Sequence, residues 1–497
     1  MRRRNFLSGL ATTGAGMLGA CQSNSGASEM ALGMNPFQHG VASGDPLTDR
    51  VILWTRVTGR GATEVVWWIA RNADGSEPVA GGSQWTESGR DFTVKVDAAG
   101  LQPDQSYFYG FKSGQWDSPV GRTRTLPVGD VSSVRMAVTS CANHPQGYFN
   151  GYRHIAGQDD LNVVLSLGDY LYEYRNGDYG DGRELTRVPE PNQEIITLQD
   201  YRQRHAQYKR DPDLQAAHQA HPWIVVWDDH ESANNSWSGG AENHTPETEG
   251  SWAERKAVAI RAYYEWMPIR EVPTGLYRSF RFGDLADLVM LDTRLEGRDQ
   301  QGTREDLDTA NDPSRSLLGP IQEARFLRHL QTLQEEGVRW KVVGQQVVFA
   351  PWTDGKSSFN PDSWEGYRAS RRKVLEHIAS NDIQDTVILS GDVHSAWGME
   401  VPDDAGTRRA VEFVAPAISS PPLATNSPQL RALVEGAPKV APHVKYANGD
   451  HNGYLLVELG RDSAEASWWF TGNRTQRNAD AEKSKTLICE TGTHQLS

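Results

Sequence analysis

Short apolar runs that stop abruptly at polar residues are the feature that most constrains the fold of this chain. Longer segments with helical periodicity, such as 254–267 and 321–334, lie among these runs. Apolar runs of this length that alternate with amphipathic helices are typical of an α/β fold. We therefore expect an α/β unit over 130–475. The apolar runs are 134–139, 161–167, 223–227, 287–291, 341–344 and 386–390.

Polar side chains that bind metals or phosphate follow these runs. The carboxyl ends of strands in α/β sheets line the crevice where ligands bind, so we expect these side chains to converge. Asp169, Asp229 and Asp392 would repel one another there, and a bound cation is the simplest way to keep them ionised. A single Asp after a strand is more often a helix cap. Several polar residues that each follow a predicted strand favour a metal or phosphate site instead. The polar residues at the tips are Cys141, Asn143, Asp169, Tyr172, Asp229, His230, Asn234, Arg294, Gln346, Asp392 and His394.

The segment 36–128 has a different pattern. Short apolar runs such as 50–54 and 65–69 are separated by Gly, Asp and Asn turn signals, which predicts a small all-β unit. Within it, 101–107 resembles the Leu-x-Pro-x-x-x-Tyr corner of fibronectin type III-like sandwiches, in which the hydroxyl of Tyr107 bonds back to upstream backbone. This segment contains no cluster of acids, bases or metal ligands. We therefore expect it to support the fold or to line one side of the site, without taking part in the chemistry.

Charge and cysteine content exclude several protein classes. The 497 residues include 64 acidic and 50 basic side chains, for a net charge of −14. This balance argues against a protein that coats nucleic acid or anionic lipid, so we expect no nucleic-acid-binding module, and an anionic substrate would need locally concentrated cations. Three cysteines are too few for a disulfide framework in a chain of this length.

The N-terminus indicates export. Residues 1–21 contain Arg3-Arg4-x-Phe6-Leu7 and a mildly apolar stretch, which resembles a twin-arginine signal peptide. The segment 18–21 also resembles a lipobox, in which Cys21 is lipidated and becomes the mature N-terminus, followed by a flexible linker over 22–35. The alternative is plain cleavage near Ala20. We expect a periplasmic or cell-surface protein whose only membrane contact is this lipid anchor.

The order and spacing of the polar motifs closely resemble the alkaline phosphatase D (PhoD) family of metallophosphatases, from the export signal to about residue 475. Against the wider calcineurin-like superfamily, Asp392 stands where His is usual, Asp229 where Asn is usual, and Cys141 replaces the first Asp-x-His. These substitutions mark the PhoD branch. The motifs are Cys141-x-Asn143, Gly168-Asp169-Tyr170-x-Tyr172-Glu173, Trp227-Asp228-Asp229-His230-Glu231, Leu291-Asp292-Thr293-Arg294 and Ser390-Gly391-Asp392-Val393-His394.

The resemblance implies a fold and a metal set. The fold would be a four-layer α/β metallophosphatase sandwich, with helices flanking two β-sheets, over 130–475. A small all-β fibronectin type III-like sandwich would precede it, and a C-terminal tail over 476–497 would follow. Asp169 would bridge the metals. Cys141, Tyr172 and His394 would hold Fe³⁺, because thiolate and phenolate suit ferric iron and do not suit calcium.

The second ion would be Ca²⁺, and other divalent metals also fit this position. Asp229 and Asp392 would hold it, assisted by Asn234 or Gln346. The choice of Asp229 over its neighbour Asp228 depends on the alignment of His230.

The catalytic residues expected are His230, Arg294 and Asn143. Metal ions would polarise the phosphoryl oxygens and generate hydroxide from water. His230 would donate a proton to the leaving alkoxide, Arg294 would offer a fork to phosphate oxygens, and Asn143 would be a neutral donor. The alternatives are a core salt bridge for Arg294 and a turn cap for Asn143.

The function expected is a monomeric, exported alkaline phosphatase with phosphodiesterase activity. Activity of the phospholipase D type, or on phosphodiester polymers, is an alternative within the same class. A lipid-anchored binding protein with a structural metal is an alternative of another class, which His230 disfavours. A serine nucleophile is disfavoured because Ser140 and Ser395 lie in no recognisable elbow or triad. Cys489 has no assigned role.

Overall fold

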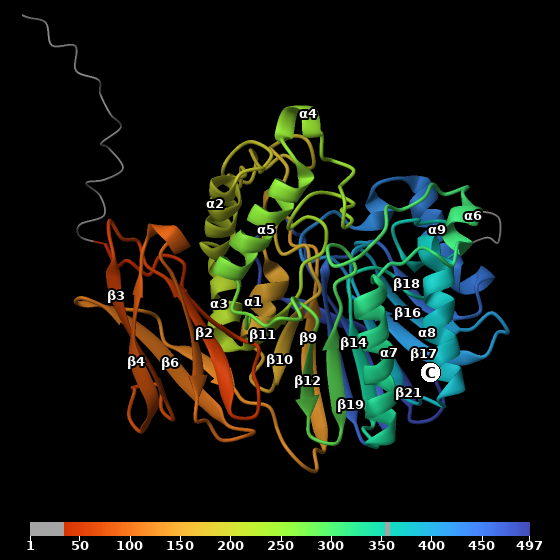
Figure 1. Ribbon diagram of the computed structural model, residues 1–497, viewed down its shortest axis with the longest axis horizontal. Helices are drawn as coiled ribbons and strands as arrows, with labels where there is room; N and C mark the ends of the chain where they lie inside the picture. Colours follow the sequence, from red (N-terminus) through yellow and green to blue (C-terminus); the bar gives the residue numbers. More distant parts are fainter. Residues whose placement is uncertain (1–33, 353–357) are drawn as a thin grey trace, which may run out of the picture.

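The computed structural model describes residues 34–352 and 358–497. Within these residues the strands form three sheets (Figure 1). The large sheet has nine strands, in the order β21 (Ala481–Glu490), β20 (Ser463–Thr471), β19 (Gly453–Gly460), β9 (Ser133–Thr139), β10 (Val163–Ser166), β11 (Pro222–Val225), β1 (Val41–Gly44), β2 (Arg50–Arg56) and β5 (Thr93–Ala99). The second sheet has seven, in the order β12 (Arg278–Phe282), β13 (Ala286–Met290), β14 (Trp340–Gly344), β15 (Thr386–Ser390), β17 (Arg408–Val414), β16 (Ala396–Pro402) and β18 (Val444–Asn448).

The N-terminal sheet and the helices complete the described structure. In that sheet β4 (Pro78–Thr86), β3 (Thr63–Ala70), β6 (Ser106–Ser113) and β7 (Trp116–Asp117) follow one another, and β8 (Gly121–Arg124) pairs with β6. The helices are α1 (Asn150–Ala156), α2 (Leu198–Lys209), α3 (Pro212–Ala220), α4 (Pro246–Glu249), α5 (Trp252–Trp266), α6 (Leu307–Asn311), α7 (Pro320–Glu335), α8 (Arg368–Ser380) and α9 (Pro428–Val440).

The large and second sheets pack face to face. Leu165 and Leu455 of the large sheet share one buried hydrophobic cluster with Leu288 of the second sheet. Trp468 of β20 links the two sheets directly, because its Nε1 donates to the carbonyl oxygen of Val414 in β17 at 2.9 Å. Close packing of this kind fixes the positions of the loops at the ends of one sheet relative to those of the other.

Helices lie on the outer faces of both sheets, as expected for an α/β fold. Phe326 of α7 and Val374 of α8 share a second cluster with Ile388 of β15, and both helices lie in front of the second sheet in Figure 1. On the large sheet, the ring of Tyr152 in α1 lies 5.5 Å from the ring of Trp223 in β11.

The N-terminal β unit shares a sheet with the rest of the chain. β1 runs parallel to β11, with Ser43 opposite Pro222, so β1, β2 and β5 extend the large sheet. Leu53 and Ile69 belong to the hydrophobic cluster between these strands and the N-terminal sheet. The sequence predicts a small all-β sandwich over 36–128 that precedes the α/β unit, whereas three of its strands join the large sheet. The difference has a physical reason, since β1 pairs with the edge of β11 that would otherwise expose backbone N–H and C=O groups.

The tyrosine corner is present in this unit. The backbone N–H of Gln102 donates to the hydroxyl oxygen of Tyr107 at 2.9 Å, and Tyr107 is fully buried. The hydroxyl of Thr125 donates to the carbonyl oxygen of Gln102 at 2.6 Å. The corner therefore ties the start of β6 to the turn before it and to the segment that leaves the unit.

The sequence predicts a C-terminal tail without regular structure over 476–497. The structure instead has strand β21 in this segment. This strand pairs antiparallel with β20, with Ser463 opposite Glu490. Its buried apolar side chains are Leu487 and Cys489, too few for the sequence pattern to reveal a strand. Exposed lysines on β21 suit an edge strand, because they discourage pairing with other chains.

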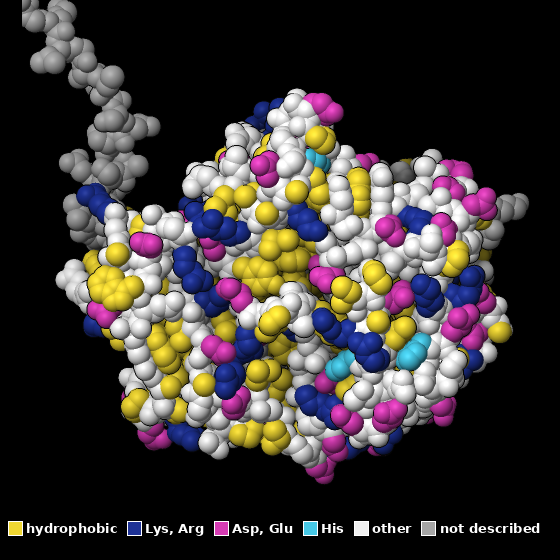
Figure 2. Space-filling model, viewed as in Figure 1, with side chains coloured by type: hydrophobic (Ala, Val, Ile, Leu, Met, Phe, Trp, Pro, Cys, Tyr) yellow, Lys and Arg dark blue, Asp and Glu magenta, His cyan; other side chains and the backbone are white. Residues whose placement is uncertain are grey.

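The predicted signal peptide over 1–21, with its lipobox, and most of the linker over 22–35 lie outside the described residues. Among the helices of the described residues, none has the length and apolar character needed to cross a bilayer. On the face seen in Figure 2, basic and acidic side chains are interspersed rather than separated into large patches of one sign.

Candidate metal centre and active site

Loops at the carboxyl ends of the two sheets meet at the candidate site. β9, β10 and β11 run parallel in the large sheet, so Cys141, Asp169 and Asp229 leave it at the same edge. β13, β14 and β15 run parallel in the second sheet and lead to Arg294 and Asp392. The polar tips of separate strands therefore come together between the sheets.

Potential metal ligands form a continuous row in this site. In each of three groups, the donor atoms lie within 4.8 Å of one another. Asp169 belongs to two of the groups and Asp229 to two, so each group shares a carboxylate with the next. The groups are Cys141, Asp169 and His394; Asp169, Asp229 and His230; and Asp228, Asp229 and Asp392.

Unpaired oxygens and strained backbone show that this row fits metal ions. Oδ1 of Asp169 and Oδ2 of Asp228 are buried without a hydrogen-bond partner in the described structure, which is costly for a carboxylate unless a cation compensates. Non-glycine residues adopt positive φ mainly where the surrounding structure enforces it, often at ligand sites. The φ angles are 59° at Cys141, 52° at Asp169, 66° at Asp392 and 48° at His394.

One end of the row carries a sulfur, a phenol and an imidazole. The hydroxyl of Tyr172 donates to Oδ2 of Asp169 at 2.9 Å and lies 3.1 Å from Nε2 of His394. The hydroxyl of Ser420 donates to the Tyr172 oxygen at 2.8 Å. Together with Cys141, these groups form a donor set suited to a transition metal rather than to Ca²⁺ or Mg²⁺.

Burial controls the protonation of these groups. It raises the pKa of the Cys141 thiol, and the Asp169 carboxylate raises it further. Burial also raises the pKa of Asp169 and of Tyr172. Burial, aided by His230, lowers the pKa of His394 to about 4, so its imidazole is neutral and competent to bind a metal. A bound cation reverses the first three effects, because thiols, phenols and carboxyls bind metals in deprotonated form.

Arg294 forms a buried salt-bridge network. Its side chain has no exposed surface, and four carboxylates surround it. The structure therefore shows the core salt bridge, which was the alternative for Arg294, and the role of Arg294 as a fork for substrate stays a prediction. The nitrogen-to-oxygen distances are 2.5 Å to Asp228, 2.7 Å to Asp362, 3.2 Å to Asp392 and 3.8 Å to Asp229.

The structure distinguishes the two neighbouring carboxylates Asp228 and Asp229. Burial raises the pKa of Asp228 to about 7, although Arg294 opposes the shift. Burial opposes ionisation of Asp229 too, yet Arg294 and His230 hold its pKa below the ordinary value, and the N–H of Asn235 donates to its Oδ2 at 2.7 Å. Asp229 is thus the carboxylate common to two ligand groups and is held ionised, while Asp228 mainly faces Arg294.

His230 is oriented by Glu173, which was not among the site residues predicted from the sequence. Its Nδ1 lies 2.7 Å from Oε2 of Glu173, and Glu173 is fully buried. Its ring stacks on Tyr172 with centroids 4.1 Å apart. The pair fixes the imidazole so that Nε2 is the nitrogen available to a substrate. The sequence signal was the glutamate that ends the motif 168–173.

The two asparagines of the prediction lie in different environments. Asn143 precedes the 3₁₀ turn His144–Gln146 but makes no side-chain cap hydrogen bond, and both atoms of its buried amide lack partners. The turn-cap alternative is therefore absent, and the amide is available to a ligand. Asn234 is only half-buried, and its Nδ2 donates to Glu242 at 3.2 Å.

Gln346 is not placed to assist a metal ion. Its Oε1 accepts from the N–H and the hydroxyl of Thr293, at 2.9 and 2.5 Å, and its Nε2 donates to the carbonyl oxygen of Leu291 at 2.9 Å. Both lone pairs of the amide oxygen are occupied. Gln346 therefore joins β14 to the loop that carries Arg294.

Asp362 is a second site residue that was not predicted from the sequence. It accepts from Arg294 at 2.7 Å and from Arg298 at 2.5 Å, and all three side chains are buried. Asp362 follows no buried apolar run, so the strand-tip pattern contained no signal for it.

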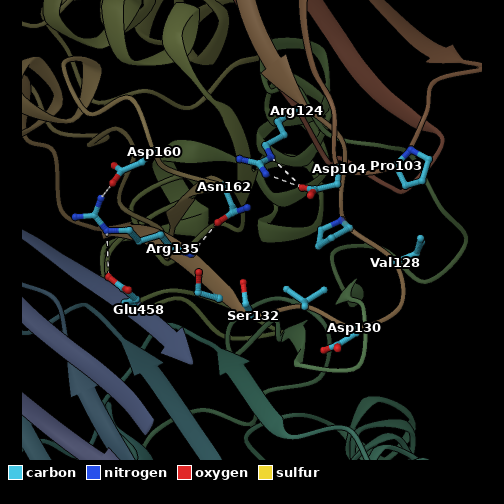
Figure 3. Close-up of a pocket in the computed structure, with 13 residues that line it drawn as sticks. Pro103, Asp104, Arg124, Val128, Asp130, Ser132, Arg135, Asp160, Asn162 and Glu458 are labelled. Carbon is cyan, nitrogen blue, oxygen red and sulfur yellow. Dashed lines mark hydrogen bonds and ion pairs between the residues drawn. The ribbon is translucent and has the colours of Figure 1, made fainter. Parts of the chain in front are cut away.

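A separate surface pocket of about 540 Å³ lies at the other end of β9 (Figure 3). Ser133 and Arg135, at the start of that strand, line it, whereas Cys141 follows the end of the strand. Seven strand residues span about 20 Å. Arg135 in this pocket is paired with Asp160 and with Glu458, and no metal-ligand group of the described residues lies here. The pocket is therefore distinct from the candidate site.

Comparison with known proteins identifies the family. The PhoD-like phosphatase family matches residues 136–468, and its N-terminal domain matches residues 21–127. The chain belongs to the PhoD-like phosphatase family. This confirms the resemblance drawn from the motifs, and it establishes the chain as a member of a family of phosphoric ester hydrolases.

Two relatives show how much of the chain the likeness covers. This PhoD-like phosphatase is 38% identical over 488 residues to alkaline phosphatase D of Bacillus subtilis (strain 168), which covers 91% of this chain and 81% of the relative. A solved structure of PhoD aligns with a TM-score of 0.85 at 34% identity, over 94% of this chain and 92% of that one. The likeness thus extends through the N-terminal β unit and the candidate site.

Proposed function

We propose that this PhoD-like phosphatase is an exported, metal-dependent hydrolase that cleaves phosphodiesters as well as phosphate monoesters. The observation that carries the proposal is the row of three ligand groups that share Asp169 and Asp229, with His230 held beside it by Glu173. A site that only stabilises the fold has no need of an oriented imidazole next to its metal ligands. For this reason a lipid-anchored binding protein with a structural metal is disfavoured.

The first metal position would be occupied by Fe³⁺. Cys141, Tyr172 and His394 would hold it, with Asp169 shared between the two positions, because a thiolate and a phenolate match ferric iron. The second position would be occupied by Ca²⁺ or another divalent ion that prefers oxygen ligands.

Carboxylate oxygens dominate the second position. Asp229 and Asp392 would hold the second ion, with Asn234 assisting through its Oδ1. Ions bound in the two positions would supply Lewis acidity toward the phosphoryl oxygens. Arg294 contributes indirectly, since it holds Asp228 and Asp392 in place while itself remaining buried.

The chain's own residues supply the proton and orient the phosphate. Glu173 accepts from Nδ1 of His230, so Nε2 faces the substrate and donates a proton to the oxygen of the leaving alcohol. Asn143 offers an unpartnered, buried amide, whose Nδ2 can donate to a phosphate oxygen and whose Oδ1 can accept a hydrogen bond from a bound water. Tyr172, stacked on His230, limits the motion of the imidazole.

The activity is tested by measuring kcat/KM on 4-nitrophenyl phosphate and bis(4-nitrophenyl) phosphate. We expect Asp169→Asn and His230→Ala each to lower both values by about 100-fold or more. Ser140→Ala tests the serine alternative, because the Ser140 hydroxyl is buried at the same edge, next to the Cys141 thiol; it should retain activity. Unchanged rates in both site variants would exclude this mechanism, and loss of activity in Ser140→Ala would favour a serine nucleophile.

Metal identity is tested by elemental analysis of the purified protein. We expect iron and calcium in the wild type, and loss of iron in Cys141→Ser with calcium retained. Fully active protein without iron would overturn the roles assigned to Cys141 and Tyr172. Phospholipids and phosphodiester polymers are the alternative substrates for such a hydrolase. Their hydrolysis is measured with the same purified protein.

Export by the twin-arginine route, with a lipid on Cys21, is also part of the proposal. The motif Arg3-Arg4-x-Phe6-Leu7 and the following Leu18-Gly19-Ala20-Cys21 support it. Replacing Arg3 and Arg4 by Lys should retain the protein in the cytoplasm, and Cys21→Ala should release it from the membrane fraction. Size-exclusion chromatography tests the expected monomer.

A further inference from the structure

Arg474 lies in the loop between β20 and β21, against the loop that follows Cys141. Its carbonyl oxygen accepts from the N–H of Tyr148 at 2.8 Å. A Cβ atom added to Gly147 would lie only 2.9 Å from Cβ of Arg474, so the two loops are in close contact. The position of the Arg474 backbone is therefore fixed by the same loop that contributes Asn143 to the candidate site.

The Arg474 side chain is a cation without a carboxylate partner among the described residues. Its Nε donates to the carbonyl oxygen of Gln146 at 3.0 Å, and neither terminal nitrogen has a hydrogen-bond partner among the described residues. Arg477, three residues later in the same loop, pairs with Asp213 at 2.7 Å. A half-buried guanidinium that lacks such a partner is available to an external anion.

Tyr179 is a neighbour of the candidate site and also of Arg474. It interacts electrostatically with Arg474, and its hydroxyl lies 3.4 Å from Nδ1 of His394. Its ring is nearly parallel to that of His230, at 9° with centroids 6.4 Å apart. Arg474 and the candidate site therefore share Tyr179 as a neighbour.

The packing of the Tyr179 loop supports this placement. A Cβ atom added to Gly180 would lie 2.3 Å from Cγ of Gln146, the residue whose carbonyl oxygen anchors Arg474. The three loops that carry Gln146, Gly180 and Arg474 therefore pack together beside the site. Arg294 lies deeper and is enclosed by carboxylates, so Arg474 is an arginine beside the site that a substrate can still use.

We propose that Arg474 binds a second anionic group of the substrate, a phosphate other than the one that is hydrolysed. This inference rests on the proposed function and narrows its substrate class to phosphate esters that carry a further phosphate. A guanidinium binds phosphate through two parallel hydrogen bonds. It also supplies the local positive charge that a chain with a net charge of −14 needs near an anionic substrate.

The test compares two chromogenic diesters that differ by one phosphate: thymidine 5′-(4-nitrophenyl phosphate) and its 3′-phosphorylated form. We expect wild type to show about tenfold higher kcat/KM on the 3′-phosphorylated substrate. In Arg474→Gln this ratio should fall to about one, and in Arg474→Lys to an intermediate value. Lys485→Gln removes an exposed charge from β21 and should leave the ratio unchanged. Because the contact is partly exposed, raising the salt concentration should also reduce the wild-type ratio.

The outcomes separate the inference from the proposed function. If wild type hydrolyses both substrates equally well, or if Arg474→Gln keeps the preference, Arg474 does not bind a second phosphate and the proposed function stands. If wild type hydrolyses neither substrate and also fails on 4-nitrophenyl phosphate, the proposed function is wrong and this inference falls with it.

Discussion

Nδ1 of His230 lies 2.7 Å from Oε2 of Glu173, a carboxylate with no exposed surface. The other oxygen of Glu173 accepts from the N–H of Asn234 at 2.8 Å. One buried carboxylate thus holds the imidazole of the site and the loop that carries a metal-ligand candidate. The contact joins the motif after β10 to the motif after β11, which are far apart in the sequence.

Glu173→Gln should reduce kcat on 4-nitrophenyl phosphate by about 10- to 100-fold, with KM changed by less than about threefold. Glutamine keeps the shape of the side chain, but it offers Nδ1 of His230 a weaker and neutral acceptor. A merely structural role would lower thermal stability and leave kcat unchanged. Glu173→Asp, which keeps the charge, should recover part of the lost rate, and wild-type kcat in Glu173→Gln would contradict the positioning role.

Arg294→Met should destabilise the metal-free protein by about 3–5 kcal/mol, because it leaves several buried carboxylates without their counter-ion. Urea unfolding in the presence of a chelator measures this loss. Restoring metal ions should recover part of the stability, since cations then compensate Asp228 and Asp392. A higher KM with unchanged stability would show instead that Arg294 contacts the substrate.

Tyr107→Phe should lower the free energy of unfolding by about 0.5–1.5 kcal/mol, because the N–H of Gln102 then loses its acceptor. Denaturant unfolding measures the change. Tyr263→Phe is the matched control, since the buried hydroxyl of Tyr263 has no hydrogen-bond partner in the described structure; it should be neutral or slightly stabilising. Equal losses in both variants would show that the corner contributes no specific hydrogen bond.

His205 should make the fold sensitive to acid. Burial, aided by the charge of Lys209, lowers its pKa to about 3, and both ring nitrogens lack partners. Between the unfolded pKa of about 6.5 and this value, the unfolded chain binds a proton that the folded protein does not. The contribution of His205 to stability is therefore fully present above pH 6.5 and declines as the pH falls, by about 1.4 kcal/mol per pH unit.

The variant His205→Phe tests this dependence by urea unfolding at pH 7.5 and pH 5. The ring still packs against Trp266, but it cannot be protonated in the unfolded chain. Relative to pH 7.5, wild type should lose about 2 kcal/mol more than the variant at pH 5. Parallel losses in the two proteins would show that His205 titrates alike when folded and unfolded.

Much of the candidate site could be predicted from strand ends. Cys141, Asp169, Asp229 and Asp392 each follow a buried run, and parallel strands bring such positions to one edge. Their residue types also predict what they can bind. Glu173 was present in a quoted motif, but nothing in its spacing showed which side chain it would contact.

The remaining site residues could not be predicted because their roles depend on distant partners. From the sequence alone, Arg294 is equally consistent with binding phosphate and with forming a salt bridge. The structure places Asp362, Asp228 and Asp392 around it. The amide of Gln346 is free or occupied depending on Thr293, which lies in another loop. Long-range contacts of this kind leave no local periodicity in the sequence.

The sequence by itself determined the α/β class, the identity of the family and the chemical types of the candidate metal ligands, because hydrophobic periodicity and residue type are local properties. The tertiary structure decided which polar groups remain free. Arg294 forms ion pairs with four carboxylates, whereas Arg474 has no carboxylate partner in the described structure. Strand β1 pairs with β11 instead of closing a separate sandwich. These outcomes follow from the requirement that buried charges and strand edges find partners, which packing satisfies only once the whole chain has folded.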